Sequence, residues 1–141
     1  MITPNEDKRA IKAILDTDSY IINKAKFKPE NIKTTKYGTD VLNNSSSDLQ
    51  IFIYLGTPEN PNVYNQKGIV FNIAVVGKRE SPAVVDSVVS QVIALLVEAE
   101  IGRGHILHLL DPPMELESDP AIYIVETAFI CYETIYNQIK T

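Results

Sequence analysis

The residues best suited to chemistry lie in one short segment of the C-terminal half. His105 and His108, the two histidines of the chain, are three residues apart, and Asp111 follows at the same interval. On a strand, a step of three residues places side chains on opposite faces, so the two imidazoles could not share one metal ion. A helix would bring them together, but Gly104 and Pro112 beside this segment argue against a helix. We therefore expect ordinary strand-end histidines and no metal site.

Acidic side chains and the one cysteine are the other candidates for chemistry. Glu115, Glu117 and Asp119 alternate in a turn-rich segment that is typical of a solvated acidic loop. The single cysteine, Cys131, excludes an internal disulfide and a cysteine-rich zinc site. It lies in an apolar strand pattern, which indicates a buried, inert thiol. Glu126 could act as a buried general base, but a strand glutamate that faces a polar neighbour or another subunit is the stronger interpretation.

The common catalytic and cofactor motifs are absent from the sequence. It contains no Gly-rich phosphate loop, no G-x-S-x-G, no H-E-x-x-H and no Cys–His pair with suitable spacing. We therefore expect no catalytic residues, no cofactor and a protein that is not an enzyme.

A helix over residues 81–101 is the element around which the rest is expected to pack. Ser81 and Pro82 suit the N-cap and first helical position, and Gly102 suits the C-cap. Apolar residues recur at steps of three and four, which forms one stripe for packing: Val85, Val88, Val89, Val92, Leu96 and Ala99.

Strands are predicted on both sides of this helix. Alternating apolar residues indicate strands over 49–55 and 67–78, which should pair as a hairpin. A short strand over 105–110 should end at Asp111, Pro112 and Pro113, and a long strand should cover 121–136. With a short N-terminal helix through about Leu15, these elements predict an α+β fold. We expect a mixed or antiparallel sheet of about four to five strands against one long central helix.

The length of 141 residues and the 45% hydrophobic content predict a single domain over 1–141. Residues 19–28 suit an edge strand, and the polar segment 29–48 suits a long mobile loop. The N-terminus is too polar for a secretion signal, and no apolar run could span a membrane, so we expect a soluble protein.

Charge is distributed unevenly along the chain. Residues 1–48 carry eight Lys and Arg against seven Asp and Glu, whereas residues 49–141 carry five against eleven, for a net charge of −5. The acidic larger part argues against binding to nucleic acid through its phosphates. It remains compatible with a surface past which DNA slides.

The last strand is apolar on both faces, although one main helix can cover only one of them. An open apolar face indicates a protein partner, and tyrosines near the end suit an interface. The candidate contact residues here are Tyr123, Val125, Phe129, Tyr132 and Tyr136.

The order of these elements resembles the tail terminator family of long-tailed phages. The resemblance rests on the segments LQIFIYLGTPENP, KGIVFNIAVVGK and SPAVVDSVVSQVIALLVEAE, then on IGRGHILHLLDPPMELESDPAIYIVETAFICYE, which together cover about residues 49–136. It implies a virion protein of the tail or neck, made in the host cytoplasm. Such a protein assembles as a hexameric ring that caps the tail tube and offers a docking surface to the head-side connector.

This resemblance also implies the partners and further contact residues. The partners would be copies of the chain itself, the tail tube protein and the head-side connector protein, with DNA passing through the lumen without specific binding and no membrane. The family's mobile loops suit 29–48 and 56–66, which carry Lys33, Lys36 and Tyr64.

Three alternatives stay open from the sequence. A head–tail connector or head-closure protein is the nearest. A non-phage adaptor would use the lysine-bearing arm 24–36. A small cytoplasmic enzyme would use His105, Asp111 and Glu126.

Overall fold

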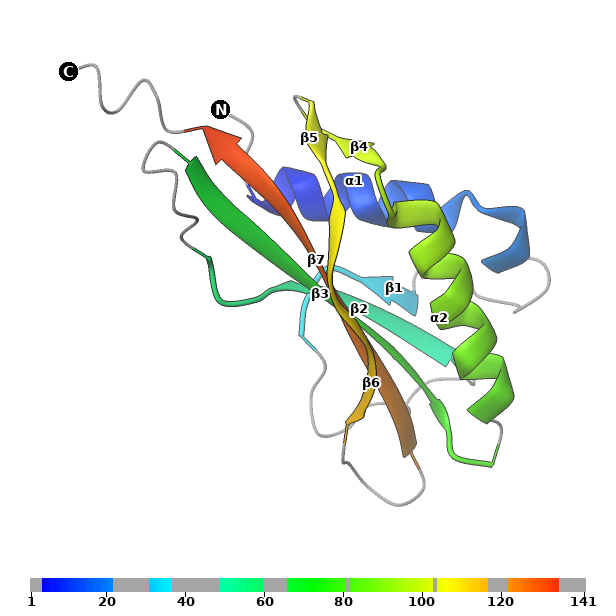
Figure 1. Cartoon of the computed structure of the whole chain (residues 1–141). Coiled ribbons are helices and arrows are strands. Elements are labelled where there is room, and N and C mark those ends of the chain that lie inside the picture. The colour runs from blue at the N-terminus through cyan, green and yellow to red at the C-terminus, as the bar shows by residue number, and fades with distance from the viewer. Residues whose placement is uncertain are drawn as a thin grey trace.

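The structure is a computed structural model that describes residues 4–21, 31–36, 49–59, 66–80, 82–102, 104–116 and 122–134. Its fold is α+β, as predicted (Figure 1). The elements follow in the order α1 (Pro4–Asp16), β1 (Ile32–Lys33), β2 (Leu49–Leu55), β3 (Gln66–Lys78), α2 (Pro82–Leu96), β4 (Glu100–Ile101), β5 (His105–Ile106), β6 (His108–Leu116) and β7 (Ile122–Thr134). Among these residues, no helix is long and apolar enough to cross a membrane.

The main sheet is mixed and has five strands in the order β1-β2-β3-β7-β6. Its centre is the antiparallel pair of β3 and β7, which runs from Gln66 opposite Thr134 to Lys78 opposite Ile122. The predicted hairpin of β2 and β3 is confirmed, with Leu55 opposite Phe71. Strand β1 adds to β2 in parallel, while β4 and β5 form a separate antiparallel pair.

The hydrophobic core lies between one face of this sheet and both helices. The predicted stripe of α2 is buried from Val85 to Leu96, and Ile11 and Leu15 of α1 join it. Full burial of one such aliphatic side chain contributes about 1.5 to 3 kcal/mol. The strand residues that face the helices are every second one, as the alternation predicted: Ile51, Ile53, Ile69, Phe71, Ile73, Val75, Val125 and Phe129.

Helix α2 is shorter than the predicted helix over 81–101, because it ends at Leu96. Glu98 adopts a left-handed conformation with φ of 63°, and its amide donates to the carbonyl of Leu107 at 2.8 Å. The chain then enters β4, so Gly102, with φ of 57°, belongs to the turn between β4 and β5 rather than to a helix C-cap.

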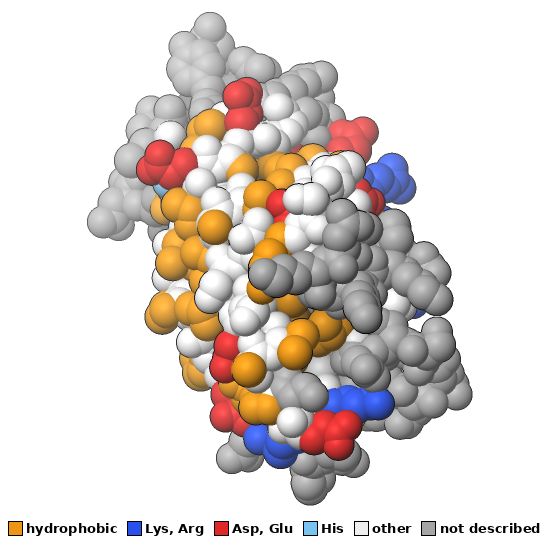
Figure 2. Space-filling view, turned by 90° about the vertical axis from the view of Figure 1, so that its right-hand side faces the viewer, with side chains coloured by type: hydrophobic (Ala, Val, Ile, Leu, Met, Phe, Trp, Pro, Cys, Tyr) orange, Lys and Arg blue, Asp and Glu red, His pale blue; other side chains and the backbone are white. Residues whose placement is uncertain are grey.

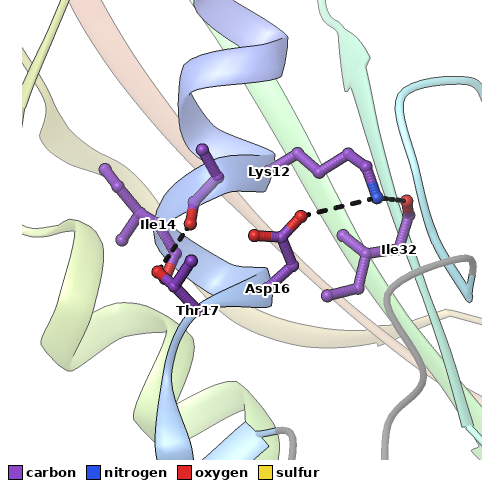
Figure 3. A network of polar contacts seen from close by, with 6 residues as sticks. Lys12, Ile14, Asp16, Thr17 and Ile32 are labelled. Carbon is purple, nitrogen blue, oxygen red and sulfur yellow. Dashed lines mark hydrogen bonds and ion pairs between the residues drawn. The ribbon is translucent and has the colours of Figure 1, made fainter.

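The predicted loop over 29–48 contains a strand, since Ile32 and Lys33 form β1. Ile32 is buried in the core, which anchors a segment that is otherwise polar. Lys12 of α1 donates to the Ile32 carbonyl at 2.7 Å and lies 3.8 Å from Asp16 (Figure 3). Residues 29–30 and 37–48 lie outside the described residues, as do 22–28 of the predicted edge strand. Residues 19–21 form a helical turn in which the Ile21 amide donates to Asp18 at 3.0 Å.

The second face of the sheet carries two smaller apolar clusters. Ala74, Val76 and Ile124 are buried in one, and Ala128 and Ile130 in the other. The expectation of an open apolar face is therefore wrong for these side chains. Part of the reason is β6, because its Leu110 and Leu116 pack against the two clusters.

Candidate assembly surface

Strand β6 is the most exposed regular element that the structure describes. It is an edge strand, since β7 is its one neighbour in the five-stranded sheet. Leu109 is 41% exposed and Met114 is 61% exposed. Exposed strand edges with apolar side chains are templates for pairing with another chain. Strand β6 is therefore the leading candidate for a contact with a second chain.

The sequence was expected to end this strand at Asp111, but β6 continues through both prolines to Leu116. The pairing with β7 shifts register twice, between Leu109 and Asp111 and between Asp111 and Met114. Thr127 donates to the Asp111 carbonyl at 2.8 Å within this irregular stretch. Prolines are tolerated in an edge strand and at bulges because no second ladder needs their amides.

Exposed apolar side chains flank β6 on both faces of the sheet. Leu109 lies opposite Phe129 on the face that carries the helices, whereas Met114 lies opposite Glu126 on the second face. Ile106 of β5 is 37% exposed and Tyr132 of β7 is 41% exposed. We call this surface the β6 edge and define it by Ile106, Leu109, Pro112, Pro113, Met114 and Tyr132.

Figure 2 views the molecule from the side on which α2 lies in Figure 1. Hydrophobic side chains form a band along the left border of this view, and charged side chains gather at its two ends. The exposed residues of α2 include four small ones, Ala83, Ser87, Ser90 and Ala94, together with Val84, which is 43% exposed, and Asp86.

Charged and aromatic residues link β6 and β7 to the start of α2. Arg79 forms an ion pair with Glu115 at 3.0 Å and lies 5.6 Å from the centre of the Tyr123 ring. Tyr123 donates to Asp86 at 2.9 Å, and this hydrogen bond raises the pKa of Tyr123 above 10.0. Tyr123, a predicted contact residue, therefore has partners within its own chain.

The other predicted contact residues fall into three groups. Val125 and Phe129 are buried in the core beneath the helices, so they offer no surface to another chain in this structure. Tyr132 and Lys33 are exposed, and Lys36 lies 5.5 Å from the centre of the Tyr54 ring. The last two, Tyr64 and Tyr136, lie outside the described residues.

Leu109 and Met114 were not among the contact residues predicted from the sequence. The signal for them was present, since apolar residues on both sides of a Pro-Pro pair suit an edge strand that cannot be paired fully. The strand was expected to end at Asp111, and so the exposed half of β6 was taken for a loop.

The residues of the enzyme alternative each meet a different partner. His105 lies 3.5 Å from Asp7 in the interior, Glu126 accepts a hydrogen bond from Tyr54, and Asp111 is held through its main-chain carbonyl. The predicted trio is therefore not one constellation in this structure.

No protein-family model and no curated protein matches the chain. Among solved structures, the fold is similar to that of a chain in the virion of a native gene transfer agent particle, with a TM-score of 0.56 and 14% identity. The likeness covers 89% of this chain and 92% of that one. At this level of identity, the likeness shows a shared fold over nearly the whole of both chains.

Proposed function

We propose that this chain is a structural subunit of a phage-like virion, and specifically a tail terminator that closes the tail tube as a homo-oligomeric ring. The fold shared with a virion chain supports the coarser part of this proposal. The order of helix and strands, which resembles the terminator family, supports the finer part.

The exposed β6 edge is the feature of the structure that best supports assembly into a ring. Each subunit presents the outer edge of β6 with exposed Leu109 and Met114. A head-to-tail interface between identical subunits closes into a ring when its rotation allows, and it then covers one such edge per subunit. Subunits in a ring thereby remove a surface that would otherwise promote disordered association.

The acidic charge of the chain fits a ring around DNA. A net charge of −5 per subunit repels phosphates, so DNA can pass through a lumen without being held. The tail tube protein on one side and the head-side connector on the other would be its partners. Neutralising residues 115–119 should then slow DNA passage by creating contacts, and unchanged passage would count against this part.

A head-closure or connector protein is the alternative that the same observations permit. It would also form a ring through the β6 edge, but it would bind a head-side ring rather than a tube end. Mixing the purified chain with tail tubes and with connector rings separately distinguishes the two, because the terminator should bind the tube ends in the absence of heads.

A thiol-protection experiment tests the interface. Cys131 is fully buried, so a cysteine introduced by Leu109→Cys would be the accessible thiol. We expect its labelling by a maleimide to slow at least tenfold when rings form. The matched control is Leu55→Cys, because Leu55 is 43% exposed on β2 and lies outside the β6 edge. Equal labelling of both cysteines in the ring would overturn the assignment of the β6 edge.

A further inference from the structure

Three side chains that could bind a metal ion meet in the interior of the fold. Asp7 comes from the first turns of α1, His105 from β5 and Cys131 from β7. One donor atom of each, a carboxylate oxygen, an imidazole nitrogen and the thiol sulfur, lies within 4.8 Å of the other two. Asp7 and Cys131 are fully buried, and the His105 side chain is 13% exposed.

The polar atoms of this cluster lack the hydrogen bonds that burial normally requires. Both carboxylate oxygens of Asp7 and Nδ1 of His105 are buried without a hydrogen-bond partner. Nδ1 lies 3.5 Å from the nearer carboxylate oxygen, which is beyond the usual length of an N–H···O hydrogen bond. Such groups are rare in folded proteins, and an ion between them is one established explanation.

We propose that Asp7, His105 and Cys131 bind one divalent transition-metal ion, with Zn²⁺ as the best fit. Sulfur, imidazole nitrogen and carboxylate oxygen are the donors that Zn²⁺ takes in proteins. At ordinary Zn–N and Zn–O lengths, two ligands of a tetrahedral site are about 3.3 to 3.5 Å apart. The separation of 3.5 Å between Nδ1 and the Asp7 oxygen fits that spacing.

A bound dication would also compensate the charges of an ionised Asp7 carboxylate and Cys131 thiolate, which burial alone disfavours. Glu133 follows Cys131 by two residues on β7 and therefore shares its face of the sheet, so it is the candidate for a fourth ligand.

A metal ion here would join three elements that are distant from one another in the chain. It would link the start of α1 and the β4–β5 pair to the end of β7, which Figure 1 places at the same end of the molecule. The ion would then act structurally, and this inference does not depend on the proposed role in a virion.

Cobalt binding to the metal-free full-length chain is the test. Thiolate ligation of Co²⁺ gives a charge-transfer band in the near ultraviolet, and tetrahedral geometry gives strong visible bands. We expect both bands to saturate at one equivalent of Co²⁺ and to disappear on addition of Zn²⁺. A wild-type chain that shows no thiolate band overturns the proposal.

Variants separate this site from surface binding. His105→Gln and Cys131→Ser should lose the thiolate band, and His108→Gln, which alters an exposed histidine on β6, should keep it. Zn²⁺ should raise the melting temperature of the wild type and of the His108→Gln variant. It should not raise the melting temperature of the His105→Gln and Cys131→Ser variants. Binding that survives in His105→Gln and Cys131→Ser, or that is lost in His108→Gln, would overturn the assignment.

Discussion

Replacing two exposed side chains of the β6 edge should weaken assembly without unfolding the subunit. The change is Leu109→Thr with Met114→Thr, because threonine keeps the preference for strand and removes apolar surface. Full burial of Leu or Met contributes about 1.5 to 3 kcal/mol. With 41% and 61% of these side chains still exposed, an interface could gain about 0.6 to 1.2 kcal/mol from Leu109 and about 0.9 to 1.8 kcal/mol from Met114.

Together, these contributions correspond to a loss of about tenfold to a hundredfold in the association constant of each interface. A closed ring repeats its interface once per subunit, so the ring should vanish at concentrations where the wild type assembles. Sedimentation over a range of concentrations measures this loss, and thermal unfolding checks the fold, because surface changes are usually within about 0.5 kcal/mol.

The matched control is Leu55→Thr, which removes an equally exposed leucine from β2. It should leave assembly unchanged. Unaltered assembly of the double variant, or equal weakening by the control, would refute the assignment of the interface to β6.

Three further changes test the packing and the charges. Phe129→Ala should destabilise the isolated subunit by about 3 to 5 kcal/mol in urea unfolding, since Phe129 is fully buried in the core. A stable variant that fails to assemble would instead make Phe129 a contact residue. Arg79→Gln should cost about 0.2 to 1 kcal/mol, and less at high salt, because its ion pair with Glu115 is exposed; a salt-independent loss in thermal unfolding would contradict this. The hydrogen bond from Tyr123 to Asp86 should stabilise the fold below pH 10.0, and its contribution should fall as pH rises through the raised pKa. Asp86→Asn should move one tyrosine ionisation to lower pH in an absorbance titration, and an unchanged curve would exclude this coupling.

The elements with strong periodicity were predictable from sequence. The valine stripe of α2 and the alternation in β2 and β3 each point one apolar set to one side, and all three sets meet in the core. The end of α2 was not predictable in the same way. Glycine at 102 suited a helix C-cap, but Glu98 took the left-handed conformation, and the following residues paired as β4 and β5.

Long-range contacts account for the other differences. Ile32 is a single apolar residue in a polar segment, and its strand depends on β2 and on Lys12 of α1. Strand β6 continues past Pro112 and Pro113 because an edge strand needs amides on one side alone. Each strand depends on a neighbour distant in the chain, which a local sequence pattern does not identify.

The Asp7–His105–Cys131 cluster could not be predicted from the sequence for the same reason. His108 and Asp111 are near His105 in the chain, and their spacing suits no metal ion. The structure instead brings His105 to residues from α1 and β7, which no short motif connects.

Particle mass in solution, with and without purified tail tubes, tests the central claim most directly, together with negative-stain images of the mixture. The proposed function predicts rings in solution, or rings that appear at the ends of tubes and nowhere else along them. A chain that stays monomeric and leaves the tube ends uncapped would contradict it.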